Sequence, residues 1–167
     1  GIAVSNGERI MVFKDMGLVS QVFDEPTLNS LNGHLAIGQC RYSTTGASVW
    51  SNAQPTFRAT TSGGLALAHN GNLTNTDELE RWLKERDASQ EVPHKDRMDS
   101  TSDTALVTAI MATYSHLGVE GAALEVLPRL RGAFCFVFMD EHSLYAARDP
   151  QGIRPLVLGR LANGWVV

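Results

Sequence analysis

Three short stretches of this sequence combine residue types that could recognise and activate a small charged molecule. The first, residues 41–46, places Arg41 at the end of an apolar run and follows it with hydroxyl side chains and a glycine. A guanidinium at a strand end can hold a carboxylate through two parallel hydrogen bonds, and neighbouring hydroxyls can complete the shell of the anion. Taken alone, a solvent-exposed arginine before a Ser/Thr loop is the simpler interpretation.

The second stretch, residues 69–72, reads HNGN and directly follows the apolar run 65–68. Gly71 can present its backbone N–H outward at a positive φ, and the carboxamide of Asn70 adds a second donor. Two donors that converge on one point form an oxyanion hole. The alternative is an ordinary Asn-Gly turn, although residues 73–74 do not continue a regular hairpin.

The third stretch, residues 100–103, reads STSD and ends on an acid in the first turn of a predicted helix. The carboxylate of Asp103 could bind a substrate ammonium group. The alternative is an ordinary partner of the helix dipole, for which acids in the first turn are common.

Together, the three stretches would supply a carboxylate binder, an ammonium binder and an oxyanion hole, which suit an amino acid attacked at a side-chain carbonyl. The nucleophile is missing from this set. Cys40 is the nearest candidate, and Arg41 could lower its pKa. Strand alternation, however, places the two side chains on opposite faces. We therefore expect Cys40 to be a small buried core thiol rather than the nucleophile.

The apolar pattern predicts the elements that must position these stretches. Strands are predicted at 2–4, 10–13, 35–42, 57–60, 65–69, 133–139, 144–147 and 155–158. Helices are predicted at 75–86, 103–115 and 119–127. Strands, then helices, then strands indicate an α+β fold with antiparallel sheets joined by hairpins. The Asn6-Gly7 pair between the first two strands is a strong hairpin signal.

Composition excludes several classes of protein. The chain has 167 residues, 43% of them hydrophobic, which is enough for one domain with its own core. Fourteen basic against eighteen acidic residues give a net charge of −4, so bulk electrostatic binding of nucleic acid is not expected. No stretch is long and apolar enough to span a bilayer, and no signal peptide is visible.

The cysteines and histidines predict neither a disulfide framework nor a metal site. Cys40 and Cys135 lie far apart in apolar runs, which is typical of reduced thiols in a cytoplasmic protein. The five histidines are dispersed and form no ligand spacing, so we expect surface or core histidines rather than metal ligands. The chain starts and ends in apolar runs, from which we expect a piece of a longer protein.

Four motifs, in this order, resemble the class II (N-terminal-nucleophile) glutamine amidotransferase domain. They are GQCRYSTTG (38–46), LAHNGNLTN (67–75), STSDT (100–104) and ARDPQGIRPLVLG (147–159). The likeness covers essentially the whole chain. The sequences RYSTTG and AHNGNLTN are similar to those of the branch of this class whose acceptor domain is a phosphoribosyltransferase.

The resemblance implies an N-terminal-nucleophile hydrolase fold, with two stacked antiparallel sheets between helical layers (αββα). It also implies roles for particular residues: Arg41 and Thr44 hold the substrate carboxylate, and Asp103 holds its ammonium. Asn70 and Gly71 form the oxyanion hole. In relatives, the segment that matches 41–52 closes over bound glutamine.

The resemblance further implies a mature N-terminal cysteine as nucleophile, and Gly1 is not a cysteine. Residues 1–167 are therefore expected to be a glutaminase domain without the N-terminal segment that carries this cysteine. The C-terminal phosphoribosyltransferase domain is expected outside this chain. We expect no cofactor in the glutaminase domain, Mg²⁺ on the phosphoribosyltransferase domain, and in some relatives an iron–sulfur cluster further downstream.

The function implied is hydrolysis of glutamine to glutamate and ammonia. The ammonia would make 5-phosphoribosylamine from phosphoribosyl diphosphate, in the first step of purine synthesis. The partners implied are glutamine, the phosphoribosyltransferase domain of the same polypeptide and further copies in a homo-oligomer, with no nucleic acid and no membrane. Two alternatives stay open: a glutaminase domain of the glucosamine-phosphate, asparagine or glutamate synthase type, or an inactive amino-acid-binding scaffold.

Overall fold

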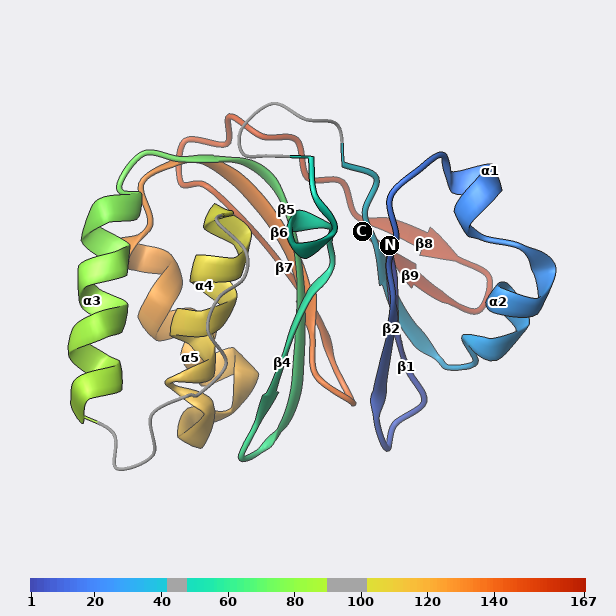
Figure 1. The fold of residues 1–167 in the computed structure, drawn as a ribbon, viewed down its shortest axis with the longest axis horizontal. Helices are drawn as coiled ribbons and strands as arrows, with labels where there is room; N and C mark the ends of the chain where they lie inside the picture. The colour runs from blue at the N-terminus through green and yellow to red at the C-terminus, as the bar shows by residue number, and fades with distance from the viewer. Residues whose placement is uncertain (42–47, 90–101) are drawn as a thin grey trace.

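Two antiparallel sheets stacked face to face organise the molecule (Figure 1). The computed structural model describes residues 1–41, 48–89 and 102–167. Sheet A has the order β2-β1-β3 and sheet B the order β4-β5-β6-β7, while β8 and β9 form a separate hairpin. The strands are β1 (Ile2–Ser5), β2 (Ile10–Phe13), β3 (Leu35–Gly38), β4 (Thr56–Thr60), β5 (Gly63–Leu73), β6 (Gly132–Met139), β7 (Leu144–Arg148), β8 (Gly159–Leu161) and β9 (Gly164–Val166).

Sheet A begins with the predicted hairpin. The Asn6 carboxamide oxygen accepts from the backbone N–H groups of Glu8 and Arg9, and Gly7 takes a φ of +92° between the strands. The strand predicted at 35–42 is shorter than expected, because β3 ends at Gly38. The backbone of Gln39 still bonds to Gly1, next to β1, while its side-chain amide donates to the His69 carbonyl of β5 over 2.9 Å.

One of the two inner strands of sheet B, β5, is longer than the sequence suggested. β5 continues through residues 69–72 and pairs with β6 as far as Leu73 opposite Gly132. The Asn-Gly turn considered for this stretch is therefore wrong: Asn70 and Gly71 lie inside a strand, opposite Cys135 and Phe134. An eleven-residue strand thus carries the candidate oxyanion hole on a paired scaffold.

The two faces of sheet B contact different layers. Side chains alternate along β5, so Leu65 and Leu67 face one way and Ala66 and Ala68 the other. The leucine face packs against the helices α3 (Thr76–Ser89), α4 (Asp103–Ala112) and α5 (Gly118–Val126), and the alanine face packs against sheet A. The short helices α1 (Val19–Val22) and α2 (Glu25–Ser30) lie on the far side of sheet A (Figure 1). The predicted αββα arrangement is confirmed.

The three predicted helices are confirmed, and two further short helices were not predicted. α3, α4 and α5 occupy the predicted positions, and the Ser102 hydroxyl caps α4 by accepting from the Ala105 N–H. The sequence pattern did not predict α1 and α2, which are four and six residues long and have no buried residue to create an apolar period. It also placed a strand at 155–158, where the backbone is irregular, and missed the β8–β9 hairpin that follows.

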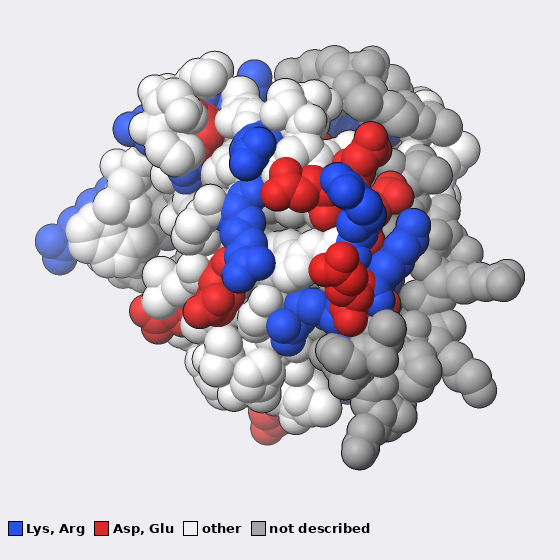
Figure 2. All heavy atoms as spheres, turned by 90° about the vertical axis from the view of Figure 1, so that its left-hand side faces the viewer, with Lys and Arg blue, Asp and Glu red and all other residues white. Residues whose placement is uncertain are grey.

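The outer surface of the helix layer carries charges of both signs. Figure 2 shows acidic and basic side chains interspersed on this side, and within α3 Lys84 lies 3.9 Å from Glu80. This mixture agrees with the small net charge of the sequence. Within residues 1–41, 48–89 and 102–167, no helix is long and apolar enough to cross a membrane.

We expect Leu67→Ala to lower the free energy of unfolding by about 2–5 kcal/mol, because Leu67 is fully buried between β5 and the helices. Leu124→Ala on α5 is the matched control, since that side chain is 71% exposed and its loss should change stability by less than about 0.5 kcal/mol. Urea denaturation of the full-length protein measures both, and equal effects would contradict the assigned core.

Candidate functional site

A pocket at one end of the sandwich brings the three candidate stretches together. Arg41 reaches it from the segment after β3, Asn70 and Gly71 from β5, and Asp103 from the first turn of α4. The pocket encloses about 500 Å³, part of which is open to solvent. Its other described lining residues are Gln39, Cys40, Gln54, His69, Asn72, Ser102 and Thr104.

The open edge of β5 supplies a backbone donor to this pocket. Strand β4 pairs with β5 only up to Leu67, so among the described strands none pairs with the edge beyond it on that side. The His69 N–H on this edge donates to the Gln54 side chain over 2.7 Å, and the Leu73 N–H donates to Asp103 over 3.2 Å. Gly71 lies midway between them, and alternate residues of a strand point their N–H groups to the same side. The Gly71 N–H therefore points into the pocket, between two N–H groups that already have acceptors.

The pairing on the other side of β5 supports this direction. Phe134, the partner of Gly71, uses both its N–H and its carbonyl for Asp149, at 3.3 and 2.8 Å. The N–H and the carbonyl of a strand residue point to the same side of the strand, so Phe134 makes its backbone hydrogen bonds on the side away from β5. Gly71 and Phe134 are thus a non-hydrogen-bonded pair, and β6 does not accept from the Gly71 N–H.

Only glycine fits at position 71. Its φ is +147°, and an added Cβ would lie 2.1 Å from the Ala133 carbonyl oxygen. The backbone of β5 approaches β6 so closely here that any side chain would push the strands apart. A positive φ at Gly71 was predicted from the sequence, and the structure confirms it.

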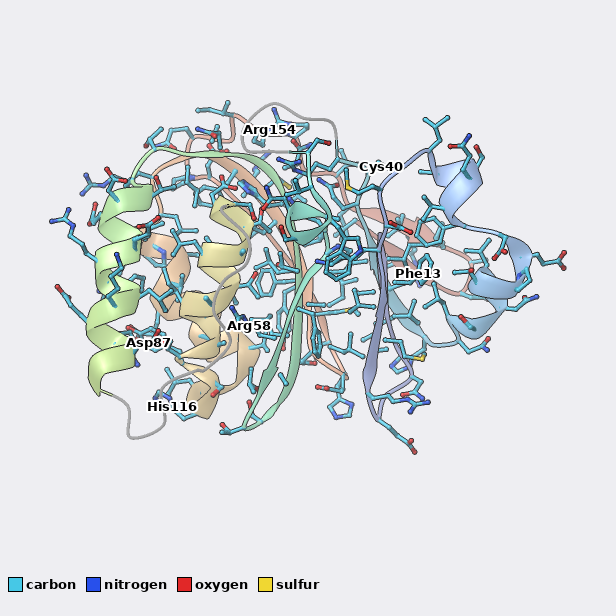
Figure 3. The ribbon with its side chains drawn as sticks, in the orientation of Figure 1. Phe13, Cys40, Arg58, Asp87, His116 and Arg154 are labelled. Carbon is cyan, nitrogen blue, oxygen red and sulfur yellow. The ribbon has the colours of Figure 1, made fainter. Side chains whose placement is uncertain are left out.

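The Asn70 side chain projects from the opposite face of β5, the side of sheet A, and is exposed at the pocket. The guanidinium of Arg154 donates to its carboxamide oxygen. Arg154 comes from the turn after β7, and Figure 3 shows it at the same end of the sandwich as Cys40. The motif at 147–159 contains Arg154, but nothing in the sequence placed this residue in the site.

Asp103 is held in place by the elements around it. Its carboxylate oxygens accept from the N–H groups of Leu73 and Thr104, and Oδ1 lies 3.5 Å from Nδ1 of His69. Burial acts to raise the pKa of Asp103, but the hydrogen bond and charge of His69 and the two backbone amides outweigh it, so the pKa lies below its usual value. The Asp103 carboxylate is therefore negatively charged at neutral pH, and it lines the pocket.

His69 is a core residue that orders the floor of the site. Its ring is buried and stacks on Phe136 with centroids 4.5 Å apart, and its Nδ1 faces both Asp103 and the Thr104 hydroxyl. The Gln54 side chain joins this network by donating to Thr104 over 3.0 Å. Surface or core histidines were expected from the sequence, and His69 is one in the core. Within the described residues, no group of three or more His, Cys, Asp or Glu could hold a metal ion.

The remaining sequence predictions have mixed outcomes. Thr44 lies outside the described residues, as does half of the segment 41–52, residues 42–47. Cys40 is exposed at the pocket, so the expectation of a buried core thiol is wrong: β3 ends two residues earlier and leaves Cys40 beyond the sheet.

Cys135 is a free thiol, as expected, and burial raises its pKa even though Arg154 and Arg148 act to lower it. Cys135 is thus poorly suited to act as a thiolate nucleophile.

Comparison with known proteins shows the family of the chain. The model of the glutamine amidotransferase domain family matches residues 39–167, and the chain therefore belongs to that family. Within it, the chain is similar to amidophosphoribosyltransferases: it is 55% identical to that of Mycobacterium leprae and 34% identical to that of Bacillus subtilis. Each alignment covers 100% of this chain but only 30% and 34% of the relative, so the chain spans about a third of the length of these relatives.

Solved structures give the same result for the fold. Glutamine phosphoribosylpyrophosphate amidotransferase from B. subtilis, complexed with ADP and GMP, superposes with a TM-score of 0.83 at 31% identity. A structure described as the allosteric regulatory enzyme of purine biosynthesis superposes with a TM-score of 0.85 at 32% identity. Both comparisons cover 98% of this chain and 34% of the other.

We expect Gly71→Ala to destabilise the full-length protein by at least about 1–3 kcal/mol, because the new Cβ meets the Ala133 carbonyl and alanine is strained at this φ. Gly164→Ala is the control, since nothing lies within 4 Å of its added Cβ and its φ is not positive. Thermal denaturation compares the two variants. A Gly71→Ala protein as stable as the control would contradict the close approach of β5 to β6 at this position.

The lowered pKa of Asp103 makes part of the stability depend on pH. A carboxyl group with a lower pKa in the folded state stabilises the protein above its unfolded pKa of about 3.9, and this contribution is lost as the pH falls through the folded value. We expect the free energy of unfolding of Asp103→Asn to fall less steeply than that of the wild type below about pH 5. Denaturant titrations from pH 7 down to pH 3 measure the slope, and identical slopes would contradict the assigned carboxylate contacts.

Proposed function

We propose that this pocket binds glutamine and supports hydrolysis of its side-chain amide. We further propose that the full-length protein acts as an amidophosphoribosyltransferase, which uses the ammonia to convert phosphoribosyl diphosphate to 5-phosphoribosylamine. The observation that carries the proposal is the Gly71 N–H, directed into a pocket that also holds Arg41, Asn70 and Asp103. The similarity to amidophosphoribosyltransferases favours this acceptor over those of the sugar-phosphate, asparagine and glutamate branches.

Each group of the substrate has a counterpart in the pocket. Arg41, with Thr44 as the resemblance implies, would hold the α-carboxylate, and the anionic Asp103 would hold the α-ammonium. These two contacts fix the amino-acid end and extend the side chain toward β5. The amide oxygen would then lie between the Gly71 N–H and the Asn70 carboxamide, where negative charge on that oxygen is stabilised.

The nucleophile of the proposed reaction is a cysteine thiolate, which the resemblance places outside these 167 residues. Its sulfur forms a bond to the amide carbon, and the carbonyl electron pair moves onto the oxygen in the donor pair. When the C–N bond breaks, the nitrogen takes a proton and leaves as ammonia, and a thioester remains. Water then cleaves the thioester to give glutamate and the free thiol.

The proposed oxyanion role of Asn70 predicts which activity is lost. In the full-length protein, Asn70→Ala should lower kcat with glutamine by about 10²–10³, because a donor to the developing charge is removed. The KM for glutamine should change less, since this donor matters most in the transition state. Synthesis of 5-phosphoribosylamine from added ammonium salt should persist, because that route does not use the pocket.

Phosphoribosylamine formation with each nitrogen source is the measurement. Equal losses with glutamine and with ammonium would mean that Asn70→Ala damages the fold, and the oxyanion assignment would fall.

The proposed carboxylate anchor predicts a different kinetic signature. Arg41→Lys keeps the charge but loses the two-pronged geometry, so the KM for glutamine should rise by at least about tenfold with a smaller change in kcat. Cys40→Ser is the adjacent control, because Cys40 lines the same pocket without a proposed role. Steady-state kinetics with varied glutamine measure both, and an unchanged KM in Arg41→Lys would reduce Arg41 to a structural residue.

A further inference from the structure

A turn after β7 brings a cation against the proposed oxyanion donor. Asp149, only 2% exposed, anchors this turn: its carboxylate accepts from the N–H groups of Ile153 and Arg154 at 3.0 and 3.2 Å, and from that of Phe134 at 3.3 Å. Gly152 completes the turn with a φ of +66° and donates to the Asp149 carbonyl. Phe134 is the strand partner of Gly71. The turn is therefore attached to the strand pair that carries the donors.

The contact between Arg154 and Asn70 sets the orientation of the carboxamide. A guanidinium has donors only, so the Asn70 atom that faces Arg154 must be Oδ1. The Nδ2 donor consequently points away from Arg154. Among the residues that the structure describes, none accepts a hydrogen bond from this Nδ2, and the Asn70 side chain lines the pocket.

We infer that Arg154 is a positioning residue for the oxyanion hole: by holding Oδ1 of Asn70, it keeps Nδ2 directed at the substrate amide oxygen. The inference rests on the proposed function of the pocket. An asparagine side chain at an exposed strand position can otherwise rotate and present either end of its amide. Fixing it before the substrate arrives removes that reorganisation from the reaction.

Arg154 also makes Asn70 a stronger donor. Its Nε is buried without a hydrogen-bond partner, and within the described part of the chain no carboxylate lies at ion-pair distance from its guanidinium. Within the described residues, no salt bridge therefore offsets the positive charge of the guanidinium. A cation bound to a carbonyl oxygen polarises the amide, and chains of hydrogen bonds strengthen one another in this way.

Arg148 provides a matched control for Arg154. It lies on β7 opposite Cys135, which in turn lies opposite Asn70, so the three residues form one row across the sheet. Both arginines lie close enough to Cys135 to influence its pKa. Only Arg154, however, donates a hydrogen bond to Asn70.

The test is a double-mutant cycle in the full-length protein with glutamine and with ammonium as nitrogen sources. Arg154→Met should lower kcat with glutamine by about 10–100-fold, less than the loss of the donor itself, and should leave the KM for glutamine and the ammonium-dependent rate nearly unchanged. Arg154→Lys should recover part of kcat, because an ammonium can still donate to Oδ1. Arg148→Met should behave as the wild type.

The cycle separates positioning from a general structural role. If Arg154 acts through Asn70, adding Arg154→Met to Asn70→Ala should cause no further loss of kcat. Multiplied losses in the double variant, an equal loss in Arg148→Met, or a parallel loss of the ammonium-dependent rate would each overturn the inference. If Arg154→Met does not fold, Arg154→Lys decides: kcat between those of the wild type and Asn70→Ala supports the inference, and loss with both nitrogen sources overturns it.

The same data distinguish failure of the inference from failure of the proposed function. A normal kcat in Asn70→Ala would overturn the oxyanion hole itself and the inference with it. A low kcat in Asn70→Ala together with a normal kcat in Arg154→Met would leave the oxyanion hole in place and overturn only the role of Arg154.

Discussion

The hydrogen-bond requirement of one strand edge governs the whole site. β5 runs past the end of β4, and a buried backbone N–H that lacks an acceptor costs free energy of about 1–3 kcal/mol. Side chains from outside the sheet meet this requirement, because Gln54 accepts from His69 and Asp103 accepts from Leu73. The Gly71 N–H between them points into the pocket, and it is the position where a substrate oxygen would complete the edge.

The groups that satisfy this edge also join the layers of the fold. Asp103 begins α4, so its bond to Leu73 fixes the end of that helix against β5. Gln54 bonds both His69 and Thr104, and Gln39 connects the end of β3 to the same strand. The proposed binders of the substrate termini are therefore attached to the strand that carries the donors. Side-chain hydrogen bonds to one strand therefore help to set the distances between them.

The sequence predicted most of what local pattern determines. Asn6-Gly7 marked the first hairpin, Ser102 marked the start of α4, and the apolar periods located the three long helices and most strands. The pattern also singled out residues 41, 70, 71 and 103, which the structure brings to one pocket.

What the sequence could not predict depends on contacts between distant segments. β3 ends at Gly38, so Cys40 is exposed instead of buried in the core, and the Gln39 side chain bonds to His69, 30 residues away in the sequence. Arg154 is 84 residues from Asn70, so no spacing rule connects them. The close approach of Gly71 to Ala133 depends likewise on strand register.

The central claim is that Gly71 and Asn70 share one substrate oxygen, and a crystal structure of the full-length protein with bound glutamate tests it most directly. The account predicts one γ-carboxylate oxygen within about 2.7–3.1 Å of both the Gly71 nitrogen and Asn70 Nδ2. The α-carboxylate should contact Arg41, and the α-ammonium should contact Asp103. A glutamate bound in the reverse direction, or a γ-carboxylate that contacts neither donor, would contradict the account.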